Sequence, residues 1–139
     1  MSGPLLATLL AAEHAAVYGY GVLGGRLDET DRRMALGAFD SHRARRDQLT
    51  SLLREAGEAP QGPLPAYDVS ASTPQQALGL AVRLEDGLAV RWRDLMGGTD
   101  DRALRMLALA GLQETAVRAA QWRVRARITP ATVPFPGTA

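Results

Sequence analysis

Four titratable residues lie in the middle of four separate stretches with helical periodicity, and this arrangement constrains the fold more than any other feature. The residues are Glu13, His42, Glu85 and Glu114. Each belongs to the apolar face of its stretch, where alanine and leucine recur at the three- and four-residue spacing of an α-helix. One inward polar group per helix, at similar depth, predicts a polar site in the core of a four-helix bundle.

The composition is that of one folded helical domain. The chain has 139 residues, of which 46% are hydrophobic and 22% are charged, enough to bury a single core. It contains no cysteine, which excludes disulfides, zinc–thiolate sites, iron–sulfur clusters and cysteine catalysis. All sixteen basic residues are arginine, a bias that we attribute to a GC-rich genome. A net charge of +1 gives no field that would attract nucleic acid, so we expect no nucleic-acid partner.

The N-terminal region has no segment that we expect to enter or cross a membrane. Its apolar run Leu5–Ala12 is interrupted by Glu13 and His14, and it is shorter than the roughly 20 apolar residues that a bilayer requires. A basic segment and a cleavage site, which would indicate a signal peptide, are also lacking. We therefore expect a cytoplasmic protein without a membrane partner.

Caps and breakers divide the chain into four expected helices, at about residues 4–24, 28–56, 73–98 and 99–127. The third has the clearest start, because Thr73 supplies an N-cap hydroxyl and Pro74 occupies the first helical position. We expect Thr99 to open the fourth. Gly111, inside that helix, predicts either close helix packing or a cavity, and we favour close packing. The proline-rich segment 128–139 is expected to be an extended tail outside the bundle domain, residues 1–127.

The connections predict the topology. The first two helices are joined by a few residues, as are the last two, so each pair should form an antiparallel hairpin. The segment 58–72 between the pairs can reach roughly 50 Å, whereas the second helix is only about 42 Å long. It can therefore run the length of the bundle, and one long crossover between two hairpins is the arrangement of ferritin-like folds.

The chain resembles the ferritin-like superfamily, and more narrowly a small actinobacterial ferritin-like family of unassigned function. Three segments carry the resemblance: Ala12-Glu13-His14-Ala15-Ala16-Val17-Tyr18-Gly19-Tyr20-Gly21, His42-Arg43-Ala44-Arg45-Arg46-Asp47 and Leu112-Gln113-Glu114. The resemblance covers residues 4 to about 127. It implies an all-α, ferritin-like four-helix bundle, and by analogy a homodimer.

The metal ligands of that superfamily are only partly matched. Di-iron members use one Glu from each of two helices and a Glu-x-x-His pair from each of the other two. Glu13 and Glu85 match the lone glutamates. Phe39 stands where a carboxylate should precede His42, and Val117 stands where a histidine should follow Glu114.

Two arginines are expected on the inward faces instead. Arg46 and Arg118 each follow a candidate ligand by one turn, and a guanidinium pairs with carboxylates but cannot ligate a metal. We therefore favour a core network in which arginine, glutamate and histidine replace the metal centre. Its expected members are Glu13, His42, Arg46, Glu85, Glu114 and Arg118.

Two functional interpretations remain open. The favoured one is a non-catalytic protein without a cofactor, acting as a structural, small-molecule-binding or partner-binding module of unknown ligand. The alternative is a metal-binding protein or metal-dependent oxidoreductase that holds iron or manganese through Glu13, His42, Glu85 and Glu114. An intact di-metal oxidase is disfavoured by the missing ligands, and a wrong register for one of these residues would change its place in the site.

Overall fold

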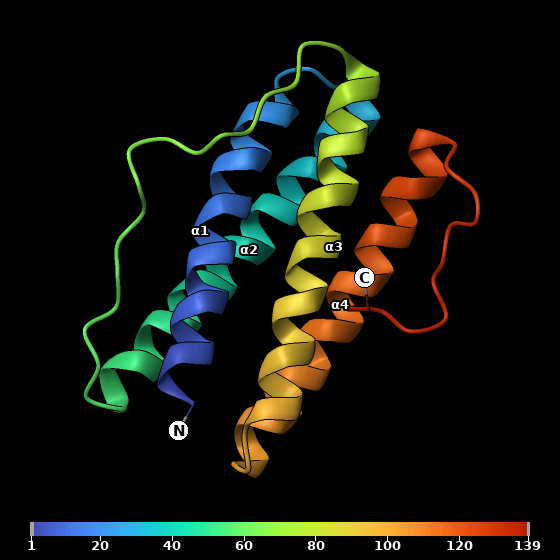
Figure 1. Cartoon of the computed structure of the whole chain (residues 1–139). Coiled ribbons are helices and arrows are strands. Elements are labelled where there is room, and N and C mark those ends of the chain that lie inside the picture. Colours follow the sequence, from blue (N-terminus) through green and yellow to red (C-terminus); the bar gives the residue numbers. More distant parts are fainter. Residues whose placement is uncertain (1, 139) are drawn as a thin grey trace.

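The computed structural model describes residues 2–138, which form four α-helices and no strand (Figure 1). The helices are α1 (Gly3–Gly24), α2 (Glu29–Glu55), α3 (Pro74–Gly98) and α4 (Arg102–Ala126). The all-α four-helix bundle predicted from the sequence is confirmed. The helix boundaries agree with the expected ones within three residues.

Side-chain caps set three of the helix starts. Asp28 accepts a hydrogen bond from the Asp31 backbone nitrogen at 2.9 Å, and Thr73 accepts one from Gln76 at 3.1 Å. The fourth helix begins after Asp101, which accepts from the Leu104 nitrogen at 2.9 Å, so the predicted start at Thr99 is wrong. Thr99 is instead the C-cap of α3, and its hydroxyl is 2.7 Å from that of Ser2. A carboxylate at the N-cap also interacts favourably with the helix dipole, which favours Asp101 over Thr99.

Two antiparallel hairpins and a long crossover build the bundle. Residues 56–73 run from the end of α2 to the start of α3 along the whole length of the molecule, beside α1 (Figure 1). His14 Nε2 lies 3.0 Å from the Gln61 carbonyl oxygen, and the rings of Tyr18 and Tyr67 are 5.4 Å apart. These contacts attach the crossover to α1. The segment has enough residues to follow this course along the bundle, as its length predicted.

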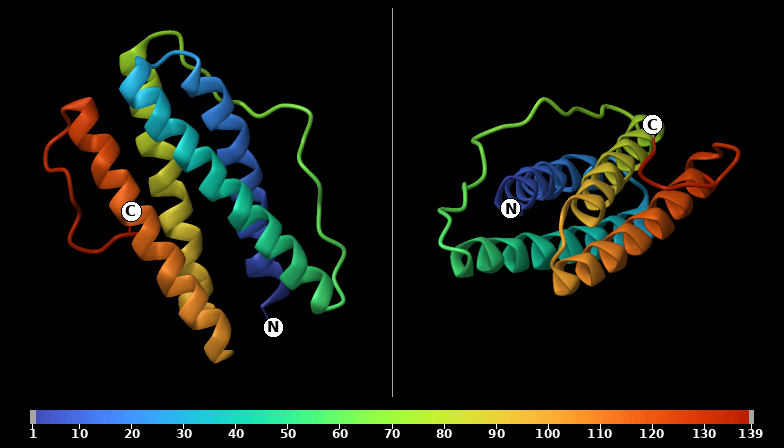
Figure 2. Two further views of the ribbon diagram at one scale, coloured as in Figure 1. Left: turned by 180° about the vertical axis from the view of Figure 1, so that it is seen from behind. Right: turned by 60° about the horizontal axis from the view of Figure 1, so that its bottom comes forward.

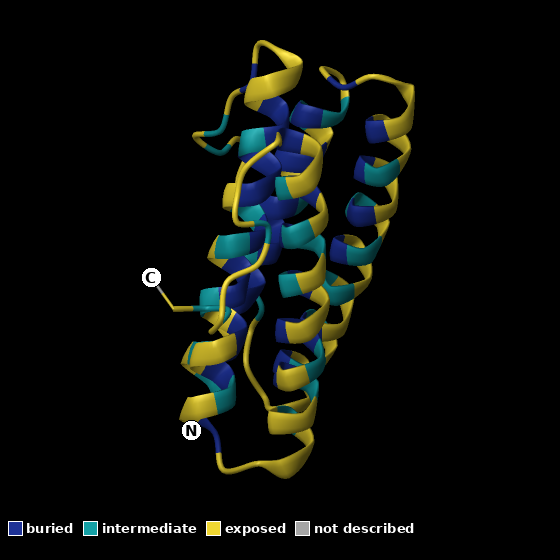
Figure 3. Ribbon diagram, turned by 90° about the vertical axis from the view of Figure 1, so that its right-hand side faces the viewer, coloured by how far each residue is buried: buried dark blue, intermediate teal, exposed yellow. Residues whose placement is uncertain are grey.

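The helices lie in two layers, with α1 and α3 on one side and α2 and α4 on the other (Figure 2). The buried faces all point to the middle of the bundle (Figure 3). Apolar residues form one cluster around Leu23, Ala38 and Trp122, and a second around Leu9, Leu53 and Trp92. Between the two clusters lies a buried polar layer that contains Glu13, His42, Glu85 and Thr115.

Helix α1 has an unusual apolar character. Over its full length, rather than over Leu5–Ala12 alone, it is the one helix among residues 2–138 long and apolar enough to cross a membrane. In this structure, Leu6, Leu9, Leu10 and Leu23 of that helix are buried in the bundle core.

The C-terminal tail folds back over the bundle. After α4 it crosses to α3, where Gly137 lies so close that a Cβ atom there would be 2.7 Å from the Ala89 carbonyl oxygen. Gly137 has a φ of +84°, a conformation that glycine adopts without strain. The tail therefore covers part of the outer surface of α3 and α4 (Figure 1).

Candidate functional site: a buried polar network

A histidine on α2 connects two buried glutamates from two other helices. His42 Nδ1 lies 2.8 Å from Glu13 Oε2, and His42 Nε2 lies 2.8 Å from Glu85 Oε2. Both carboxylates and the imidazole are almost entirely inaccessible to solvent. Arg118 on α4 donates from Nη1 to Glu85 Oε1 at 3.1 Å. The network thus draws one charged side chain from each helix.

Two aromatic residues extend the network. The Tyr20 hydroxyl donates to Glu85 Oε2, and Trp122 Nε1 donates to the Tyr20 oxygen at 2.9 Å. The Tyr20 ring also stacks on the His42 imidazole, with ring centroids 5.3 Å apart. Glu85 is therefore the centre of the network, because it accepts hydrogen bonds from His42, Tyr20 and Arg118.

The electrostatics favour a charged His42. Burial lowers its pKa, but hydrogen bonds and charge interactions with Glu13 and Glu85 outweigh that effect and raise the pKa from 6.5 to about 9. For Glu85, burial acts to raise the pKa. The interactions with His42, Arg118 and Tyr20 outweigh burial and bring the pKa of Glu85 below its ordinary value. The Tyr20 hydroxyl has a pKa well above its ordinary value, because of burial and the adjacent Glu85 charge.

Of the two glutamates in the network, Glu13 has fewer favourable interactions to offset the burial of its carboxylate. Burial dominates and raises its pKa, and its Oε1 is the one fully buried side-chain oxygen or nitrogen in residues 2–138 without a hydrogen-bond partner. Within residues 2–138, His42 is the one hydrogen-bond partner of its Oε2. Two carboxylates therefore face two cations, His42 and Arg118, but Glu85 receives most of the hydrogen bonds.

Two predicted members of the network lie elsewhere. Glu114 is on the surface with half of its side chain exposed, and it pairs with Arg45 on α2 at 2.7 Å. Arg46 lies beside Asp47, 3.0 Å away, rather than in the core. Both placements follow from helix register, because α4 turns Gly111 and Thr115 inward and α2 turns His42 and Leu49 inward.

The register of α4 identifies Thr115 as the inward residue in place of Glu114. Its hydroxyl donates to the Gly111 carbonyl oxygen of its own helix at 2.6 Å, and within residues 2–138 it has no hydrogen bond to Glu13, His42, Glu85 or Arg118. Thr115 and Arg118 then stand three residues apart, which is the spacing of the Glu-x-x-His pairs of di-iron four-helix bundles. On α2 the corresponding positions hold Phe39 and His42.

The residues of the network do not fit a di-metal centre. Such centres need carboxylates to balance the metal charge, and the two additional carboxylate positions hold Phe39 and Thr115. Both nitrogens of His42 are engaged by glutamates, and Arg118 brings a positive charge to Glu85. Within residues 2–138, no cluster of three or more His, Cys, Asp or Glu side chains is arranged to hold a metal ion.

Sequence reasoning missed Tyr20 and Trp122 as members of the site. Tyr20 lies seven residues after Glu13 on the same face of α1, a spacing of two turns. That spacing is the signal that could have placed its hydroxyl near the polar layer. Trp122 follows Arg118 by four residues on α4, but an indole on an apolar face has no feature that separates it from an ordinary core residue.

Comparisons with known proteins give a family without an assigned activity. The structure is similar to the crystal structure of a conserved hypothetical protein, rv2844, from Mycobacterium tuberculosis, with a TM-score of 0.86 and 29% sequence identity. The match covers 89% of this chain and 96% of that one. No functionally curated protein matches the chain significantly. Residues 6–139 match the model of a domain of unknown function, DUF4439, and the chain therefore belongs to the DUF4439 family.

Proposed function

We propose that this protein is a ferritin-like bundle in which a polar network has replaced the metal centre, and that it is a non-catalytic small-molecule-binding module. The observation that carries the proposal is the bridging position of His42 between Glu13 and Glu85. A histidine that donates both ring protons to carboxylates has no lone pair left for a metal. His42 and Arg118 supply the positive charge that metal ions would otherwise bring to the two glutamates.

Binding is supported by a cavity on the outer side of α3 and α4. It has a volume of about 980 Å³, a size that suits a ligand of low molecular weight. The network itself is too closely packed and too buried to receive such a ligand. In this proposal the network fixes the four helices, and the cavity performs the binding.

The metal content of the protein tests the first half of the proposal. Elemental analysis of freshly purified, untagged protein is expected to give no stoichiometric iron or manganese, before and after anaerobic incubation with Fe(II) and Mn(II). A chelator should leave the melting temperature unchanged. Stoichiometric metal that is lost in Glu13→Ala and Glu85→Ala would reject the proposal and favour a metal-dependent oxidoreductase. The unpaired Glu13 Oε1 is the observation that keeps this alternative worth testing.

A fluorescent apolar dye tests the second half. Anilinonaphthalene sulfonate is expected to bind the folded protein with about one molecule per chain, because the cavity is apolar and open. Absence of any dye binding would remove the support for a binding module.

The proposal also includes a homodimer and a cytoplasmic location, expectations that come from the resemblance and the composition. Met106 and Leu109 are exposed and nearly one turn apart on α4, and they supply an apolar patch on which two bundles could pair. Sedimentation velocity measures the pairing directly, and a single monomeric species at micromolar concentration would contradict it.

A further inference from the structure

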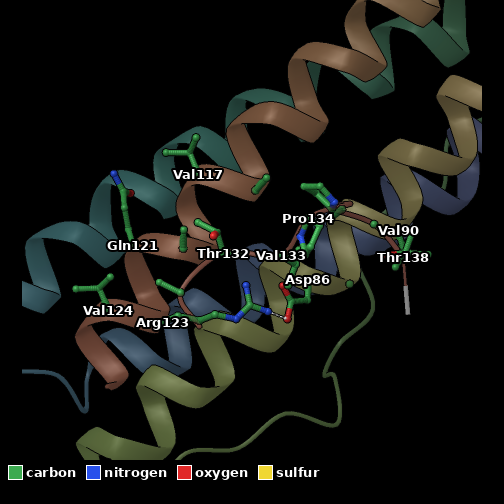
Figure 4. A pocket seen from close by; sticks show the side chains of 18 residues that line it. Asp86, Val90, Val117, Gln121, Arg123, Val124, Thr132, Val133, Pro134 and Thr138 are labelled. Atoms are coloured by element: carbon green, nitrogen blue, oxygen red, sulfur yellow. Dashed lines mark hydrogen bonds and ion pairs between the residues drawn. The ribbon is translucent and has the colours of Figure 1, made fainter. Parts of the chain in front are cut away.

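The cavity between α3, α4 and the C-terminal tail is separate from the polar network. It runs between Asp86–Val90 of α3 and Ala116–Val124 of α4, and tail residues Val133 and Pro134 cover it (Figure 4). None of the network residues lines it. Along α4 its lining extends from Ala116 to Val124, or about 12 Å of helix.

The cavity is lined by small aliphatic side chains. Its walls are mainly alanine, valine and proline and include Gly87, and among residues 2–138 no aromatic ring contributes to the lining. A Cβ atom added at Gly87 would meet no atom within 4 Å, so there is free space above this helix position. Phe135 in the covering tail is 73% exposed and does not fill the cavity. These walls can surround a flexible aliphatic group.

One largely buried cation lines this apolar space. The Arg123 side chain lines the cavity (Figure 4) and is only 12% exposed, and it forms an ion pair with Asp86. Within residues 2–138, this pair through Nη2 is the only hydrogen bond of the Arg123 side chain, although a guanidinium has five N–H donors. The Asp86 side chain is 44% exposed, so its carboxylate can turn to solvent. The remaining donors of Arg123 are suited to a second carboxylate.

We propose that this cavity binds a free fatty acid, with the aliphatic chain between α3 and α4 under the tail and the carboxylate paired with Arg123. Asp86 competes with the ligand for the same guanidinium. This inference rests on the proposed function of a binding module, and it adds the class of ligand and the residue that selects it.

Isothermal titration calorimetry of the full chain with dodecanoate, below its micelle concentration, tests the proposal. Dodecyltrimethylammonium, which has the same chain and a cationic head, is the matched control ligand and is expected to bind much more weakly. Arg123→Gln should weaken dodecanoate binding about tenfold, since a charge-assisted hydrogen bond is lost. Asp86→Asn should strengthen it, because the competing charge is removed. Arg105→Gln, an exposed arginine on the same helix, should leave the affinity unchanged.

Filling the cavity gives an independent test. Gly87→Leu is expected to abolish dodecanoate binding without unfolding the protein, because the new side chain enters free space. Gly37→Leu is the control, since Gly37 also has free space around it but lies on α2, away from the cavity. Equal affinities for both ligands, or an unchanged affinity in Arg123→Gln, would overturn the proposal. So would a dimer that Gly87→Leu dissociates without any dodecanoate binding, because a second copy would then be the occupant.

The two proposals fail in different ways. If the dye binds and is excluded by Gly87→Leu while dodecanoate does not bind, the fatty-acid inference is wrong and the binding module stands. If the protein takes up stoichiometric metal through Glu13 and Glu85, the proposed function is wrong whatever dodecanoate does.

Discussion

Glu85 makes more side-chain hydrogen bonds than any other residue of the network. It is fully buried and accepts from His42, Tyr20 and Arg118. Its removal therefore deprives Arg118 of its carboxylate and leaves His42 with Glu13 alone. We expect Glu85→Ala to lower the free energy of unfolding by about 3–5 kcal/mol, measured by urea denaturation. Glu114→Ala, which removes a half-exposed partner of Arg45, should cost no more than about 1 kcal/mol. Equal effects of the two substitutions would contradict the placement of Glu85 in the core.

The raised pKa of His42 makes stability depend on pH. In the folded chain its pKa is about 9, against 6.5 in the unfolded chain, so the folded state holds the proton more tightly. The corresponding stabilisation is complete below pH 6.5 and is lost as the pH rises through 9. We expect the melting temperature to fall between neutral pH and about pH 10. The chain contains no lysine or cysteine, which leaves few other groups to titrate in this window.

Nuclear magnetic resonance gives a direct check on the same residue. The ring nitrogens of His42 should report a titration midpoint near 9 in the folded protein. A midpoint at or below 6.5, the ordinary value, would show that His42 is neutral between the two glutamates.

Helix α4 shows why the sequence placed some site residues and misplaced others. His42 and Glu85 lie on helices with a clear core face, and Glu13 is the one acidic residue of α1, which is apolar on all sides. The structure brings these three residues together. Helix α4 carries apolar residues on both faces: Ala108, Leu112 and Ala119 are buried, whereas Met106, Val117 and Val124 are exposed. Periodicity could not select its inward face, so Glu114 was chosen where Thr115 is the inward residue.

The fold itself was predictable because it depends on features that repeat along the chain. Helix ends are marked locally by residues such as Thr73 and Gly24-Gly25, and the length of the crossover determines which ends meet. The course of the tail was not predictable, since its docking depends on one glycine, Gly137, that approaches α3. The sequence around Gly137 has no feature that distinguishes a glycine in such a contact from a glycine in an ordinary turn.

Close packing between α3 and α4 determines how a substitution of Gly111 should change stability. A Cβ atom at this position would overlap the buried indole ring of Trp92, as expected from the close-packing interpretation. We expect Gly111→Ala to destabilise the protein by about 1–3 kcal/mol, although alanine favours helices. Gly37→Ala on α2, where a Cβ meets no neighbour, should instead stabilise it by about 0.5–1 kcal/mol. Thermal melts of the two variants should therefore shift in opposite directions.

On the scale of the whole molecule, we expect the bundle to fold without the tail. Among residues 128–138, none is buried, so the core should survive without them. A chain truncated after Arg127 is expected to unfold cooperatively, within about 1 kcal/mol of the full-length protein, while its dye binding is reduced. Circular dichroism and denaturation measure the first effect. Loss of helical structure on truncation would contradict a domain that ends near residue 127.

The polar network also has a consequence for how the chain folds. Its charged members are contributed by all four helices, so a state in which only the α1–α2 hairpin has docked holds Glu13 and His42 without Glu85 and Arg118. Any such intermediate must either keep its centre hydrated or bury uncompensated charge, and both choices raise its free energy. Partly assembled states are therefore disfavoured relative to both the unfolded chain and the finished bundle. A layer that adds little net stability can thereby make assembly all-or-none.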